Sequence, residues 1–172
     1  MNTKEQIAEA LHINVINEID PESRLIICVK KNITKDNGEV AELDVGHFGL
    51  ICAHSTGIAF NAWDGYTKVM NWYPEYPNLT FTDKFTENDF FNWRINSFRK
   101  LVLEISSDKE FEKIKEKLIK DEIPFRICGE IAFGSAEVAI VIFPLTKENT
   151  PKYLKFLKTY RWQDFKNFII KF

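Results

Sequence analysis

The sequence predicts an α/β fold in which a four-stranded mixed sheet is sandwiched by helices. Two continuous apolar runs, 25–29 and 138–143, have the length and the β-branched residues of strands buried on both faces of a sheet. Two further runs, 100–105 and 125–131, are also typical of strands, and segments with helical spacing of apolar residues lie between several of these runs. The predicted order is β-α-loop-β-α-β-β-α, with helices on the faces of the sheet.

Length and composition favour a single domain over residues 1–172. The chain is 45% apolar and 14% aromatic, which is enough for a sizeable core. Its net charge of −2 excludes a general positive field that attracts nucleic acid or an anionic membrane, so any such binding has to be local. The sequence has no apolar run of membrane-spanning length and no signal-peptide core, so a cytoplasmic protein is expected. Three cysteines in apolar segments predict reduced, buried thiols.

The segment 24–60 predicts a buried strand that leads into a long helix. Two lysines follow the strand, and a polar loop is expected over 32–38. Glu39, Glu42 and Asp44 are expected in the first turns of the helix, because carboxylates favour its positive end. Beyond these residues the helix is apolar on nearly all sides.

The second half of the chain predicts two more helices before the third strand. A short helix is expected over 87–93. Ser106 or Ser107 is placed to cap a longer helix, in which Phe111 and Leu118 lie on the apolar face.

A fourth strand and a last helix complete the expected core. The run 138–143 is apolar throughout, which indicates a central strand; a turn over 133–135 precedes it and Pro144 is expected to end it. Thr150 and Pro151 predict a helix start, with a capping hydroxyl followed by proline at the first helical position.

This order of elements, with several short strings, resembles the type II peptidyl-tRNA hydrolase family. The resemblance covers 24–162 and rests on the opening strand with its lysine-containing loop, on 93–105, on the helix 107–120, and on Ala-Phe-Gly-Ser at 132–135, where the family has Ala-Pro-Gly-Ser or similar. It implies an enzyme that cleaves the ester between a peptide and tRNA without a metal or an organic cofactor. It also implies that the loop after the first strand lies by the active-site cleft.

The chain departs from the family at the residues that carry the chemistry. The family's loop-to-helix motif has a lysine, a glutamine and a histidine, and an ungapped match puts Glu39, Leu43 and Gly46 at these positions. A glutamate in place of the lysine reverses the electrostatics that stabilise developing negative charge. The family's Asp-Ala-Gly-Arg-Thr segment corresponds to 125–130, where only Glu130 supplies a carboxylate, at a displaced position.

Two functions are therefore expected. In the first, the chain is a divergent peptidyl-tRNA hydrolase-like domain that lacks the catalytic set and serves as a binding or interaction module for RNA, a small ligand or a protein. In the second, it is a divergent peptidyl-tRNA or aminoacyl-tRNA ester hydrolase in which His47, Glu130 or Lys31 replaces the missing groups. Turnover of peptidyl-tRNA distinguishes the two.

One side of the long helix carries the strongest candidate chemistry. Asp44, His47, Ile51 and His54 lie at spacings of three, four and three, which places them on the same side. In one interpretation Asp44 orients His47 as a general base, and His54 adds a second base or a partial metal site that lacks a third ligand. In the other, Asp44 and His47 are an ordinary surface pair and His54 caps the last carbonyls. Cys52 is most simply a buried thiol.

Basic residues form three candidate contacts for tRNA or another phosphate-bearing ligand. Lys30, Lys31 and Lys35 follow the first strand, where the resemblance places the cleft, although solvated loop lysines are common. The other two sets are Arg94, Arg99 and Lys100, and a stripe of Lys152, Lys155 and Lys158 along the last helix with Arg161 beyond it.

Aromatic residues outside the sheet suggest two further contacts. The long loop 64–86 predicts a flap that presents Trp72 and Tyr73 to a ligand or partner, or rings that cover an edge of the core. Residues 163–172 predict an amphipathic C-terminal helix. It either packs on its own domain, with a short N-terminal helix at 3–11 as one candidate partner, or mediates a homo-oligomer or a protein contact.

Overall fold

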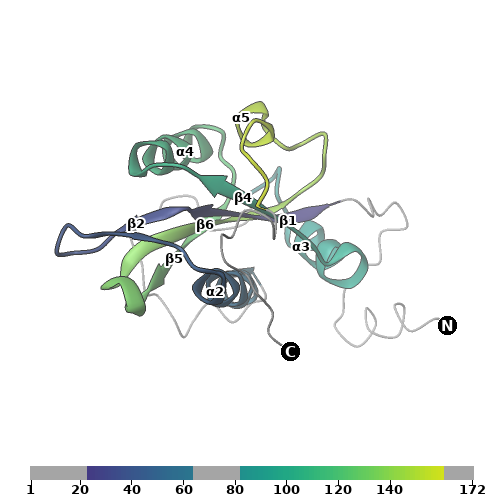
Figure 1. Cartoon of the computed structure of the whole chain (residues 1–172). Coiled ribbons are helices and arrows are strands. Elements are labelled where there is room, and N and C mark those ends of the chain that lie inside the picture. Colours follow the sequence, from purple (N-terminus) through teal and green to yellow (C-terminus); the bar gives the residue numbers. More distant parts are fainter. Residues whose placement is uncertain (1–22, 64–81, 161–172) are drawn as a thin grey trace.

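The computed structural model describes residues 23–63 and 82–160. Its centre is a four-stranded mixed sheet in the order β4-β1-β6-β5 (Figure 1). The strands are β1 (Arg24–Lys30), β4 (Arg99–Ile105), β5 (Phe125–Glu130) and β6 (Ala136–Leu145). β1 and β4 are parallel, whereas β6 runs antiparallel to both β1 and β5. The predicted α/β class and the four-stranded mixed sheet are confirmed.

Helices cover both faces of the sheet, which explains why the central strands are apolar without alternation. α2 (Val45–Trp63) and α3 (Glu87–Asn92) lie on one face, and α4 (Asp108–Lys120) and α5 (Lys152–Lys155) lie on the other (Figure 1). The two apolar runs of the sequence are the middle strands, since β1 and β6 pair with each other. The predicted central position of 138–143 is thus confirmed.

The helices flanking β4 begin at the residues that the sequence indicates. Ser107 Oγ accepts a hydrogen bond from the Glu110 N–H at 3.2 Å and caps α4, whose apolar face buries Phe111 and Leu118. A reciprocal capping box of Thr86 and Asp89 starts α3.

α3 continues into a π-helical turn, η1 (Trp93–Ser97). Phe98 ends this turn with a left-handed backbone, φ 46°, a conformation that costs a bulky side chain about 1 kcal/mol. The sequence contains no signal for this turn, since neither glycine nor asparagine stands at the left-handed position.

A β-hairpin replaces the predicted loop and first helical turns at 32–44. β2 (Asn32–Thr34) pairs antiparallel with β3 (Val40–Glu42), and α2 begins only at Val45. Gly38 supplies the left-handed turn, φ 81°, while the N–H of residue 38 donates to the Lys35 carbonyl at 2.8 Å. The prediction was wrong because carboxylates are compatible with an exposed hairpin as well as with a helix start. Of the three acidic residues, only Asp44 caps the helix.

Three smaller predictions at the end of the core were also wrong. β6 continues through Pro144 to Leu145. Proline has no N–H to donate to a neighbouring strand, and it is tolerated here because the pairing with β1 is irregular at this point. Thr150 does not cap α5, since its hydroxyl donates to the Thr146 carbonyl at 2.6 Å. α5 ends at Lys155, so the predicted lysine stripe does not follow one helix. Residue Lys158 lies beyond it, and its carbonyl accepts the Glu104 N–H at the outer edge of β4.

Several predictions fall wholly or partly outside the described residues. These are the N-terminal helix, most of the aromatic loop 64–86, the C-terminal helix 163–172 and the oligomer or partner contact assigned to it. Cys28, Cys52 and Cys128 are free, as predicted, although Cys52 is only partly buried. Over residues 23–63 and 82–160, no helix has the length and apolar character needed to cross a bilayer.

Candidate functional site

Asp44 holds His47 at the start of α2. One carboxylate oxygen of Asp44, Oδ1, accepts the His47 backbone N–H at 2.9 Å, and Oδ2 lies 2.6 Å from Nδ1 of the same imidazole. These hydrogen bonds, the backbone one foremost, hold the pKa of Asp44 below its usual value. An ionised carboxylate at Nδ1 favours the tautomer in which Nδ1 carries the proton, so Nε2 is the nitrogen left to accept one. The pair shares one side of the helix, as predicted.

The His47 ring packs against the turn between β5 and β6. This turn contains the short 3-10 helix η2 (Ile131–Phe133), and the Phe133 ring lies 5.1 Å from the imidazole between centroids. Gly134 ends the turn with φ 74°, and a Cβ at this position would lie 2.8 Å from an Asp36 carboxylate oxygen. The hairpin, the first turn of α2 and the β5–β6 turn therefore meet at this corner of the sheet.

Glu130 joins the second histidine to the same turn. Its Oε2 lies 3.3 Å from His54 Nδ1, and its Oε1 accepts the Ala132 N–H at 3.1 Å. The Glu130 side chain is only 7% exposed, whereas His54 is half exposed. The interpretation of His54 as a cap of the last carbonyls is wrong, because α2 continues to Trp63. Oε1 of Glu130 is held by a local hydrogen bond, whereas Oε2 lies near His54 but is buried without a hydrogen-bond partner among the described residues. Its burial limits the access of a substrate to this carboxylate.

The two histidines form a partly exposed row along α2. Their separation of seven residues corresponds to about 10 Å along the helix axis. Leu50, between them in the sequence, is 43% exposed, and Ile131 on the neighbouring turn is 79% exposed. This arrangement offers imidazole nitrogens with an apolar border to a ligand. Within the described residues, no three His, Cys, Asp or Glu side chains are placed to hold a metal ion.

The cysteines near this site are poor nucleophiles. Burial raises the pKa of the Cys52 thiol to about 11 and that of Cys128 to about 11. A thiol with such a pKa is almost entirely protonated at neutral pH. The interpretation of Cys52 as a structural thiol is therefore favoured.

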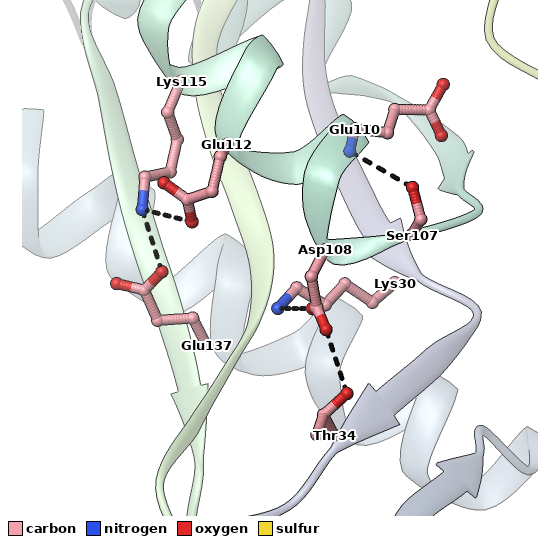
Figure 2. A network of polar contacts seen from close by, with 8 residues as sticks. All are labelled: Lys30, Thr34, Ser107, Asp108, Glu110, Glu112, Lys115 and Glu137. Carbon is pink, nitrogen blue, oxygen red and sulfur yellow. Dashed lines mark hydrogen bonds and ion pairs between the residues drawn. The ribbon is translucent and has the colours of Figure 1, made fainter.

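Lys30 is committed to the opposite face of the sheet (Figure 2). Its Nζ lies 2.6 Å from Asp108 Oδ1 at the start of α4 and 4.2 Å from the centroid of the Phe111 ring. Thr34 Oγ1 donates to the other oxygen of Asp108 at 2.9 Å. The buried Lys30 thus links β1, the hairpin and α4, which makes it a structural residue rather than the predicted ligand contact.

The other two lysines after β1 differ from each other. Lys35 pairs with Glu39 inside the hairpin at 3.0 Å. Lys31 forms no ion pair with a described residue, and its carbonyl accepts the N–H of Leu43, the residue before Asp44, at 3.0 Å. Of the three predicted lysines, Lys31 is the one without an ion pair among the described residues, and its backbone lies next to the start of α2.

Asp108→Asn should lower the free energy of unfolding at neutral pH by less than about 1 kcal/mol, because Asp108 is half exposed and solvent screens its interaction with Lys30. The hydrogen bond from Lys30 holds the pKa of Asp108 below its usual 3.8. Since the pKa is lower in the folded than in the unfolded chain, this contribution is present above about pH 4 and is lost as the pH falls through the folded value. Urea unfolding of both proteins near pH 7 and near pH 3 measures it. A difference that stays constant with pH would contradict this role.

The contacts of Phe133 and Asp36 had no signal in the sequence. Phe133 was expected only as a turn residue, and Asp36 only as part of a loop; both reach the site through tertiary contacts. The positions of the ungapped family match do not meet here, since Glu39 is in the hairpin and Leu43 is buried. Trp72 and Tyr73 lie outside the described residues.

The fold and the site define an α/β protein with a mixed four-stranded sheet and a row of two histidines on a helix beside the β5–β6 turn. No protein-family model matches the chain, and no curated protein matches it.

Proposed function

We propose that the protein is a peptidyl-tRNA hydrolase-like domain that binds tRNA or a related phosphate-bearing ligand beside His47 and has lost the family's catalytic set. The order of the main elements supports the resemblance. After the inserted hairpin, α2, α3, β4, α4, β5, β6 and α5 follow β1 in the order that the sequence predicts. The sharp turn at 132–135 also lies where the resemblance puts it.

The state of Glu130 favours binding over turnover. A replacement catalytic carboxylate has to reach the ester or the attacking water, but Glu130 is buried, caps η2 and faces His54. Lys30 and Lys35 are both neutralised by carboxylates, and Glu39 is an acid where the family has its lysine. The groups that remain accessible are Lys31, whose ammonium can donate to a carbonyl or phosphate oxygen, and His47, whose Nε2 can accept a hydrogen bond from a ligand hydroxyl.

The geometry of the Asp44–His47 pair favours a second candidate, a divergent ester hydrolase. A carboxylate that fixes Nδ1 of an imidazole leaves Nε2 to take a proton from water, as in other orienter-and-base pairs. Lys31, whose backbone lies next to the start of α2, is the candidate to stabilise a developing oxyanion. The hydrolase candidate requires catalytic turnover of peptidyl-tRNA, whereas the binding module predicts none.

Labelled peptidyl-tRNA should bind the protein without catalytic release of free tRNA. His47→Ala and Lys31→Ala should each weaken binding by up to about ten-fold, since each loses one hydrogen-bonding or charged contact. Fluorescence anisotropy measures the binding, and gel separation of acylated from free tRNA measures the release. Lys113→Ala, which changes an exposed lysine on α4, is the matched control.

If the protein releases tRNA catalytically and His47→Ala abolishes this release, the ester hydrolase is the correct candidate and the binding module is wrong. Absence of both binding and release would contradict both candidates. If His47→Ala, Lys31→Ala and Lys113→Ala bind with equal affinity, the ligand does not bind at the His47 corner.

A further inference from the structure

We propose that a second surface, formed by Phe98, Arg99 and Lys100 and here called the basic-aromatic surface, binds single-stranded RNA. It lies where η1 passes into β4. The inference rests on the proposed function in taking RNA as the partner, but it assigns that partner to residues outside the His47 corner.

Phe98 is an exposed ring on a rigid base. Its side chain is 46% exposed, while its ring lies 5.3 Å from that of the fully buried Trp93 and 6.0 Å from that of Phe60. The indole N–H of Trp93 donates to the Arg99 carbonyl at 2.8 Å, so the backbone that carries the surface is anchored to the core. The π-helical turn and the left-handed Phe98 are unfavourable local conformations of the kind often retained at functional sites.

Two cations accompany this ring without a carboxylate partner among the described residues. Lys100 Nζ lies 3.1 Å from the centroid of the Phe98 ring and donates to the Phe98 carbonyl at 3.1 Å, and burial lowers its pKa. Arg99 is exposed and precedes Lys100 on the edge strand β4, where successive side chains point to opposite faces of the sheet. Four described lysines do have a carboxylate within ion-pair distance, namely Lys30, Lys35, Lys115 and Lys158, whereas Lys100, like Lys31, has none among the described residues.

The position of Lys100 favours a phosphate-bearing partner. No carboxylate of residues 23–63 or 82–160 pairs with it, and it has already lost part of its hydration, so an incoming phosphate meets a cation that costs less to desolvate. When the ammonium turns to the phosphate, it uncovers a ring face on which a base can stack. An acidic peptide would satisfy the two cations but would leave the exposed ring without a flat partner.

The surface is separate from the His47 corner. α2 carries His47 near its start and Phe60, which contacts Phe98, near its end. Thirteen residues separate them, or about 20 Å of helix, and the two side chains leave the helix on roughly opposite sides. The two sites can therefore be tested independently.

The test uses the full chain and a labelled single-stranded RNA of about twelve nucleotides that carries no ester. Fluorescence anisotropy is recorded over a salt series up to about 0.15 M. The double variant Arg99→Gln with Lys100→Gln should bind about ten-fold more weakly and lower the salt slope by about 1.4, because each phosphate contact on a single strand contributes about 0.7. Lys113→Gln, at an exposed α4 lysine, should leave both values unchanged.

Phe98→Leu should also weaken binding about ten-fold at unchanged salt slope, because it removes base stacking but no charge. The melting temperature of Phe98→Leu shows whether weaker binding comes from lost stacking or from lost folding. If Phe98→Leu unfolds the chain, the variant Arg99→Gln with Lys100→Gln tests whether this surface binds RNA. The proposal would be overturned if the Phe98 and charge variants bound the RNA as tightly as Lys113→Gln does, or if the parent chain did not bind it. Loss of RNA binding in these variants but not in His47→Ala would support this surface even if the proposed function fails.

Discussion

Ile140→Asp should unfold the protein or destabilise it by several kcal/mol. Ile140 lies in the middle of β6, is 0% exposed, and stands in register with Cys28 of β1 and Ile127 of β5. A carboxylate at this position lies on the same face of the sheet as Cys28 and Ile127, which are apolar and buried and offer no charge to pair with. Because domains are stable by only about 5–15 kcal/mol, this penalty is comparable with the whole free energy of unfolding. Far-UV circular dichroism and urea unfolding measure the change.

Ile131→Asp is the matched control for this prediction. It makes the same chemical change at a residue that is 79% exposed in η2, so the free energy of unfolding should change by less than about 0.5 kcal/mol. A soluble Ile140→Asp protein that melts at the temperature of the control would refute the central placement of β6.

Trp63→Ala should lower the free energy of unfolding by about 3–5 kcal/mol. Trp63 ends α2 and is 1% exposed. Its ring lies 5.3 Å from that of Phe143 on β6 and 5.8 Å from that of Phe90 on α3. Removing it leaves a large cavity where the end of α2 packs on the sheet and on α3, and the backbone of a helix and a central strand cannot close around it.

Trp63→Phe should cost much less, about 1 kcal/mol. The indole N–H is buried without a hydrogen-bond partner in the described part of the chain, so phenylalanine removes an unsatisfied donor while it keeps most of the ring contacts. Urea unfolding followed by circular dichroism compares the three proteins independently of tryptophan fluorescence. Equal losses for the two variants would show that a hydrogen bond of the indole, rather than ring packing, holds this corner.

The local sequence could predict the sheet and most helices because their signals lie within one segment. The continuous apolar runs of β1 and β6 report burial on both faces, and Ser107 with the apolar spacing of Phe111 and Leu118 defines α4. The pairing of Asp44 with His47 was predictable for the same reason, since residues three apart in a helix are neighbours.

The hairpin and the partners of the site could not be predicted in this way. The segment 32–42 is polar and short, so its pattern suits a loop, a helix start or a hairpin, and backbone pairing between β2 and β3 decided among them. Lys30 and Lys31 look equivalent in the sequence. The tertiary structure buries Lys30 against α4, whereas Lys31 stays without an ion pair among the described residues.

The sequence by itself determined the class of fold, the central strands and the histidine row on α2. Apolar runs indicate buried strands, and helical spacing indicates which residues share a side of a helix, so both can be recognised within one segment. Only the tertiary structure decided that Glu130 faces His54, that Phe133 packs on His47, and that Phe98 stays exposed beside Lys100. These contacts join residues that are from two to more than eighty positions apart in the chain. Their geometry depends on how α2, η1 and the β5–β6 turn pack on the sheet, and no local pattern of side chains encodes that packing.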